Sequence, residues 1–125
     1  MLLDTDVLAE DLQAQANQMG ARGKWDPSAL LAAHAEAEGL AASIQSNEPA
    51  ALFFALARRS GAFGKLAATF IPSAARAQAA AIGYELLLED IELALFRTGV
   101  LRGELTFDHL RAWFADALRP LGALR

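Results

Sequence analysis

The sequence contains no cysteine, and only two of its 125 residues are histidine. The absence of cysteine excludes disulfide bonds, thiolate metal sites, iron–sulfur ligation and a cysteine nucleophile. Residues that favour β-strands are also scarce, because valine, isoleucine and threonine together number ten. No segment keeps the apolar–polar alternation of a half-buried strand. We therefore do not expect a fold built on a β-sheet.

Long uncharged apolar runs are missing as well. The longest stretches without a formal charge have ten residues, as at 12–21, whereas a membrane-spanning helix needs at least ~18. We expect no transmembrane helix. Residues 1–6 lack the basic start of a signal peptide and turn acidic at once, so we expect a cytoplasmic location. Arginine outnumbers lysine nine to two, which is typical of GC-rich bacterial genomes.

Alanine and leucine are abundant, with 29 and 21 residues. Both are strong helix formers. Apolar residues make up 54% of the chain and charged residues 21%, which leaves enough apolar surface to form a core and argues against disorder. We predict an all-α fold, a compact bundle of about five helices. It forms a single helical domain over 1–120, followed by a frayed tail over 121–125.

Capping signals predict where most of the helices begin. The first helix begins at about Asp4 or Thr5 and ends at Met19, and Asp26 followed by Pro27 starts a second one. Asn47 starts a third helix, and Thr106 starts the last, which ends before Pro120. The apolar spacing predicts these buried residues: Leu8, Leu12, Ala16 and Met19; Leu30, Ala33, Ala37, Leu40 and Ile44; Leu52, Phe53 and Leu56; Leu110, Trp113, Phe114 and Ala117.

The longest helical pattern covers about 72–98 and predicts a long central helix with Gly83 inside it. A glycine in a helix interior costs about 1 kcal/mol relative to alanine, which a well-packed helix tolerates. Apolar residues cover two sides of this pattern, so we expect neighbouring helices to pack on both. One side carries Ala79, Ile82, Leu86 and Leu93, and the other carries Tyr84, Leu88, Ile91 and Leu95.

The net charge of −4 is unevenly divided along the chain. No acidic residue lies between Pro49 and Tyr84, where the basic residues form a candidate contact surface: Arg58, Arg59, Lys65 and Arg76. With Phe63 and Phe70 nearby, this basic segment, 58–76, could hold a phosphate backbone and stack a base. It could also bind an acidic protein surface, or simply be the solvated side of a helical hairpin.

A candidate acidic contact surface follows it, formed by Glu85, Glu89 and Glu92. Their i, i+4, i+7 spacing predicts a single line along the long helix. Such a line is usually a solvated face, although paired carboxylates can also support acid–base or metal chemistry. A third interpretation is a docking surface for a basic partner. The basic segment of a second copy would supply one, so self-association is a concrete possibility.

The two histidines do not form a recognisable metal or catalytic motif. His34 has Glu38 one turn later, which predicts a surface pair on one helix face. His109 lies beside Asp108 in the first turn of its helix, where we expect a similar structural role. The segment Gly61–Lys65 superficially resembles a phosphate-binding loop but lacks the rest of that motif. We predict no catalytic residue, no metal ligand and no cofactor.

These observations favour a small non-catalytic helical subunit that acts through its helix faces, in a homo-oligomer or a larger complex. The expected partner is another protein or a second copy of the chain. We expect no binding to a membrane. The alternative is an accessory subunit that contacts the RNA or DNA backbone through 58–76. A carboxylate-dependent enzyme is a distant third possibility. The sequence pI of about 5.1 argues against a dedicated nucleic-acid-binding protein.

Overall fold

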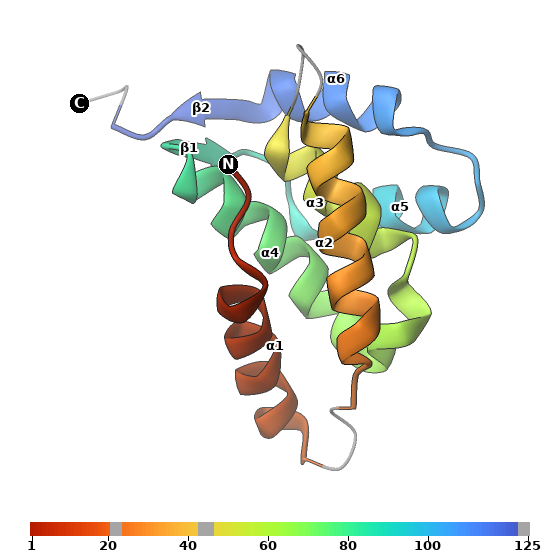
Figure 1. Cartoon of the computed structure of the whole chain (residues 1–125). Coiled ribbons are helices and arrows are strands. Elements are labelled where there is room, and N and C mark those ends of the chain that lie inside the picture. The colour runs from red at the N-terminus through yellow and green to blue at the C-terminus, as the bar shows by residue number, and fades with distance from the viewer. Residues whose placement is uncertain (21–23, 43–46, 123–125) are drawn as a thin grey trace.

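The computed structural model describes residues 1–20, 24–42 and 47–122, and within them the fold is helical, as predicted (Figure 1). Within these ranges, a compact bundle of six α-helices carries one short 3-10 helix and one pair of short strands. In chain order the elements are α1 (Thr5–Met19), α2 (Pro27–Ala41), α3 (Glu48–Ala57), η2 (Ser60–Leu66), α4 (Ala67–Ala81), β1 (Tyr84–Leu86), α5 (Asp90–Leu101), α6 (Phe107–Ala117) and β2 (Leu118–Pro120). No helix in these ranges is long and apolar enough to cross a bilayer.

The predicted capping residues begin their helices as expected. The Asp26 carboxylate accepts the Ser28 N–H at 2.9 Å at the start of α2. The Asn47 side chain accepts the Ala50 N–H at 3.0 Å at the start of α3. At α6, the Thr106 hydroxyl accepts the His109 N–H at 3.3 Å. Each bond satisfies an N–H group that has no partner within its own helix.

The centre of the bundle is α3, which packs against α2, α4, α5 and α6. Every residue from Pro49 to Ala57 except Phe54 is buried, so this helix has almost no solvent side. The buried stripe of α2 includes two small residues, Ala33 and Ala37, which have no exposed surface. Small side chains let helix backbones approach closely. The alanine-rich composition therefore serves the packing around α3.

The long helix expected over 72–98 is wrong in its bounds. The long helical segment lies earlier in the chain. It consists of η2 and α4, which follow one another directly and together span 22 residues. Its end is set by Gly83, whose φ of 86° is a left-handed conformation that ends a helix. The chain then runs through β1 and starts a new helix, α5, at Asp90.

The two strands explain the break. Tyr84, Glu85 and Leu86 of β1 pair in antiparallel register with Pro120, Arg119 and Leu118 of β2. Two further backbone bonds extend the pairing, from the Leu87 N–H to the Ala117 carbonyl at 2.8 Å and from the Leu121 N–H to the Gly83 carbonyl at 3.0 Å. The chain after α6 thus returns to the segment after α4 (Figure 1). Residues 123–125 of the predicted tail lie outside the described residues.

Most of the predicted apolar stripes face the core. The buried residues include Leu8, Leu12 and Ala16 of α1, Leu30, Ala33 and Ala37 of α2, and Leu110 and Phe114 of α6. Trp113 differs from its prediction, because 40% of its surface is exposed. Ile44 lies outside the described residues. Phe53 and Phe114 join α3 to α6, with ring centroids 5.4 Å apart.

Candidate functional site

Arg58 and Arg59, the first two residues of the candidate basic surface, form ion pairs with a carboxylate of the same chain. Arg58 and Arg59, directly after α3, both pair with the Glu36 carboxylate of α2, and the Arg59–Glu36 distance is 2.5 Å. Arg59 also donates to the Ala55 carbonyl at 3.1 Å. One carboxylate thus bridges two neighbouring guanidinium groups and ties the end of α3 to α2. The +2 charge that the sequence places here is half neutralised within the fold.

The other two basic residues separate. The Arg76 guanidinium on α4 lies 2.7 Å from the Asp90 carboxylate and 3.0 Å from the Leu88 carbonyl oxygen. Lys65 is exposed and has no ion-pair partner among the described residues. Phe63 and Phe70, the two phenylalanines of the basic segment, are fully buried core residues. Their ring centroids lie 5.8 Å apart, so the rings pack on each other and cannot stack on a base. Three of the four cations therefore serve packing within the chain.

The candidate acidic residues do not form a line on one helix, which corrects the prediction. Glu85 lies on β1, opposite Arg119 of β2. Glu89 is the N-cap of α5, and its backbone N–H donates to the Glu92 carboxylate at 3.0 Å. Glu89 and Glu92 together form a capping box, in which each satisfies a backbone N–H near the start of the helix. Their spacing reflects the start of α5 and not a long acidic face.

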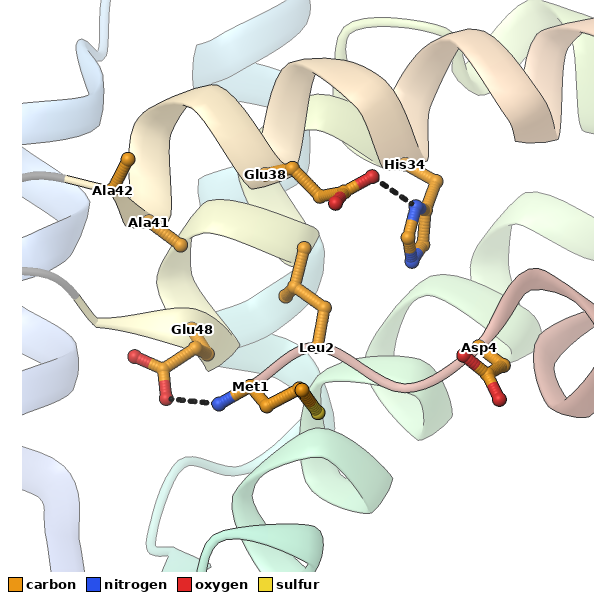
Figure 2. Close-up of a pocket in the computed structure, with 8 residues that line it drawn as sticks. All are labelled: Met1, Leu2, Asp4, His34, Glu38, Ala41, Ala42 and Glu48. Atoms are coloured by element: carbon orange, nitrogen blue, oxygen red, sulfur yellow. Dashed lines mark hydrogen bonds and ion pairs between the residues drawn. The ribbon is translucent and has the colours of Figure 1, made fainter.

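His34 pairs with Glu38 as predicted, through Nδ1 at 3.0 Å, but it is more buried than a surface histidine, since only 15% of its side chain is exposed. Its Nε2 contacts the Leu3 carbonyl oxygen at 2.8 Å, a partner that the spacing along α2 could not reveal. His34 therefore fixes the segment before α1 against α2. The His34 ring lies between Glu38 and this segment (Figure 2).

A cleft of about 490 Å³ adjoins this histidine. It is lined by Met1, Leu2, Asp4, His34, Glu38, Ala41, Ala42 and Glu48. The polar groups pair across it, because the Met1 amino group lies 3.2 Å from the Glu48 carboxylate and His34 contacts Glu38 (Figure 2). Within the described ranges, no three His, Asp or Glu side chains are grouped so that they could hold a metal ion. The cleft is an outcome of packing the N-terminal segment onto α2.

His109 also has a structural role. Its Nδ1 accepts the Thr106 backbone N–H at 3.2 Å and completes the capping box at the start of α6. The imidazole stacks on Trp113, with centroids 5.9 Å apart, and Trp113 stacks in turn on Phe96 of α5 at 5.1 Å. This aromatic stack joins α6 to α5.

The most distinctive surface is one side of α5. Ile91 is 67% exposed, Leu95 is 66% exposed and Leu101 is 49% exposed, whereas Leu93 and Val100 on the opposite side are buried. At about 100° per residue, the three exposed side chains lie within an arc of about 120° around the helix axis, and Ala94 and Thr98 lie in the same arc. We call this set, Ile91, Ala94, Leu95, Thr98 and Leu101, the α5 face. The prediction that Ile91 and Leu95 are covered by neighbouring helices is wrong for the chain alone.

The helix that carries this face lies at one side of the bundle, packed on α3 and α4 (Figure 1). Two charged residues border the face on the same edge. Asp90 and Arg97 are seven residues apart, which corresponds to two helical turns and brings them to nearly the same angle. The Asp90 side chain is 84% exposed even though it pairs with Arg76. Arg97 has no ion-pair partner among the described residues.

Comparisons with known proteins add no further assignment: no protein-family model, no curated protein and no solved structure matches this chain.

Proposed function

We propose that this protein is a non-catalytic helical interaction module that binds another protein chain through the α5 face. The observation that carries the proposal is the exposure of Ile91 and Leu95, about two thirds each, one turn apart on a helix whose other side is buried. Contiguous exposed apolar patches mark interaction sites, whereas isolated exposed apolar residues need no explanation. Helix-in-groove and helix-on-helix recognition use this i, i+4 spacing.

The gain from covering this face is substantial. Complete burial of a leucine or isoleucine side chain contributes about 1.5–3 kcal/mol, so covering side chains that are two-thirds exposed contributes about 1–2 kcal/mol each. Leu101, half exposed, adds to this amount. Such a patch supplies the apolar centre of a small interface, and the charged edge residues supply its polar rim.

The nucleic-acid alternative has less support than its sequence pattern gave it. Arg58 and Arg59 share the Glu36 carboxylate, and Arg76 holds Asp90, so contact with phosphate would have to compete with these pairs. The buried phenylalanines offer no stacking platform. The enzyme alternative has less support from the carboxylates that suggested it, because Glu89 and Glu92 bond to backbone N–H groups at the start of α5.

A pair of matched variants tests the proposal. Leu95→Asp places a charge at the centre of the α5 face, and Leu31→Asp makes the same change on α2, where leucine is 59% exposed. Light scattering of the purified protein and affinity capture from the cells that produce it give the two readouts. We expect association with itself or with a captured partner to be lost in Leu95→Asp and kept in Leu31→Asp. Association that is insensitive to Leu95, or no association of either kind, would contradict the proposal.

A further inference from the structure

We infer that the partner of the α5 face is a second copy of this chain, bound with the two α5 helices antiparallel across a two-fold axis. The inference rests on the proposed function, because it names the partner of the same surface. It draws on a separate observation, the order of charges along the edge of the α5 face. A homodimer with two-fold symmetry uses the same patch on both chains, so the patch must be complementary to itself.

The edge charges meet that condition. Asp90 begins α5 and Arg97 follows two turns later on the same edge. In an antiparallel pair, the same edges of the two helices lie side by side and run in opposite directions. An axis midway between the two residues therefore places Asp90 of each chain beside Arg97 of the other. A parallel two-fold pair brings opposite edges of the two helices together, so Asp90 and Arg97 of one chain would not face those of the other.

The apolar residues fit the same axis. Ile91, Ala94 and Leu95 lie on either side of the midpoint between Asp90 and Arg97, so they would form the centre of the contact. Ala94 is small, which allows the helices to approach while Ile91 and Leu95 of the two chains interdigitate. The most exposed apolar side chains of α5 thus come to the place where a two-fold pair buries most surface.

The contacts within the chain leave both edge charges accessible. The Arg76 pair uses Oδ1 of Asp90, and that side chain remains 84% exposed. Arg97 has no competing carboxylate in the described part of the chain. One helix from each chain makes a small interface, at the weak end of the range for specific complexes. We therefore expect a dissociation constant on the order of 10–100 µM.

The test exchanges the two edge charges. In Arg97→Glu, both edge pairs of the dimer would become acid against acid, and in Asp90→Lys both would become base against base. We expect each variant alone to raise the dissociation constant at least about tenfold in sedimentation equilibrium. An equimolar mixture of the two restores attraction at both pairs, so we expect it to associate about as strongly as the wild type. The double variant should do the same alone.

Matched controls make the same charge changes elsewhere. Lys65→Glu reverses an exposed cation on η2, and Asp6→Lys reverses an exposed acid in the first turn of α1. Neither should change association. Circular dichroism and the melting temperature establish that each variant is folded. If Asp90→Lys fails to fold because it loses its pair with Arg76, the wild type still tests the inference, because raising NaCl from about 50 to 500 mM should weaken its association.

Three results would overturn the inference: a wild type that remains monomeric at millimolar concentration, a mixture that stays as weak as its two components, or association that does not change with salt. These results differ from failure of the proposed function. A monomeric wild type that still binds a different protein in a Leu95-dependent manner would overturn only the second copy as partner. Loss of all Leu95 dependence would overturn both.

Discussion

The Arg76 guanidinium and the Asp90 carboxylate lie 2.7 Å apart and join the most basic part of the sequence to its most acidic part within one molecule. Arg76 also donates to the Leu88 carbonyl oxygen at 3.0 Å, so it spans the connection between β1 and α5. A charge division that suggests attraction between molecules is thus partly resolved inside the chain. We propose a different surface for the partner, the α5 face, with Asp90 and Arg97 on its edge.

The Arg76 contacts should have a measurable effect on stability. Arg76→Ala removes an ion pair and a hydrogen bond to the backbone. The Arg76 side chain is 39% exposed, so solvent partly screens the ion pair. We expect a loss of about 1 kcal/mol in the free energy of unfolding, measured by urea denaturation. Lys65→Ala is the matched control, and it should change stability by less than about 0.5 kcal/mol. Equal effects of the two changes would show that the Arg76 contacts are unimportant.

Gln78 should be among the most sensitive polar residues. Its side chain is fully buried, and it accepts the Leu3 N–H at 2.7 Å and donates to the Met1 carbonyl at 2.9 Å. Gln78→Leu leaves both backbone groups without their partner, so we expect a loss of about 2 kcal/mol in unfolding free energy and faster amide exchange at Leu3. Gln18→Leu, at an exposed position on α1, is the control. Unchanged exchange at Leu3 would contradict this assignment.

Two glycines in helices should respond to alanine in opposite ways. A Cβ added at Gly99 would lie 2.6 Å from Cδ1 of Leu105, so Gly99→Ala must displace a side chain that packs on the core. We expect a loss of about 1–3 kcal/mol in unfolding free energy. Gly39, inside α2, has nothing within 4 Å of the added atom. Gly39→Ala should therefore stabilise the protein by about 0.5–1 kcal/mol. The same sign for both changes would be inconsistent with this packing.

The start of α2 should show a pH-dependent contribution from Asp26. The pKa of its carboxyl group is lowered from the ordinary value of 3.8, first by the hydrogen bond from the Ser28 hydroxyl and then by the one from the Ser28 backbone N–H. A lowered pKa in the folded state means stabilisation that is present above the unfolded value and lost as pH falls through the folded value. Wild type should therefore melt above Asp26→Ala at pH 7.

The pH dependence of that difference provides the check. The gap in melting temperature between wild type and Asp26→Ala should be constant near neutrality and should shrink below pH 3.8, as the carboxylate of the wild type takes up its proton. Asp4→Ala is a suitable control, because Asp4 precedes α1 but its side chain makes no capping bond there. A gap between wild type and Asp26→Ala that stays constant into the acid range would contradict a role for the carboxylate charge.

Local features of the fold were predictable from the sequence because their causes are local. Asp26, Asn47 and Thr106 bond to N–H groups two or three residues away, so the helix starts they define depend on a few neighbouring residues. The helix break at Gly83 was not predictable in this way. Glycine can lie inside a helix or end one. Whether the helix ends at Gly83 depends on pairing between β1 and residues 118–120, which are far along the chain.

The arrangement of the candidate site residues was not predictable for the same physical reason. Arg58 and Arg59 meet Glu36, which is more than twenty residues away, so their neutralisation is invisible in a local charge count. The acidic spacing at Glu89 and Glu92 could have been interpreted as a capping box, since the N-cap and N3 positions are three residues apart. The exposure of Ile91 and Leu95 has no local signal, because a buried helix face and a binding face have the same apolar pattern.

We propose that two copies of this chain meet at the α5 face. The most direct measurement is the concentration dependence of the backbone amide signals of the wild type in NMR, from about 20 µM to 1 mM, which brackets the affinity expected for so small an interface. We predict shifts concentrated at residues 90–101 and little change in α1 or α2. Signals that do not move with concentration, or that move mainly outside α5, would contradict the claim.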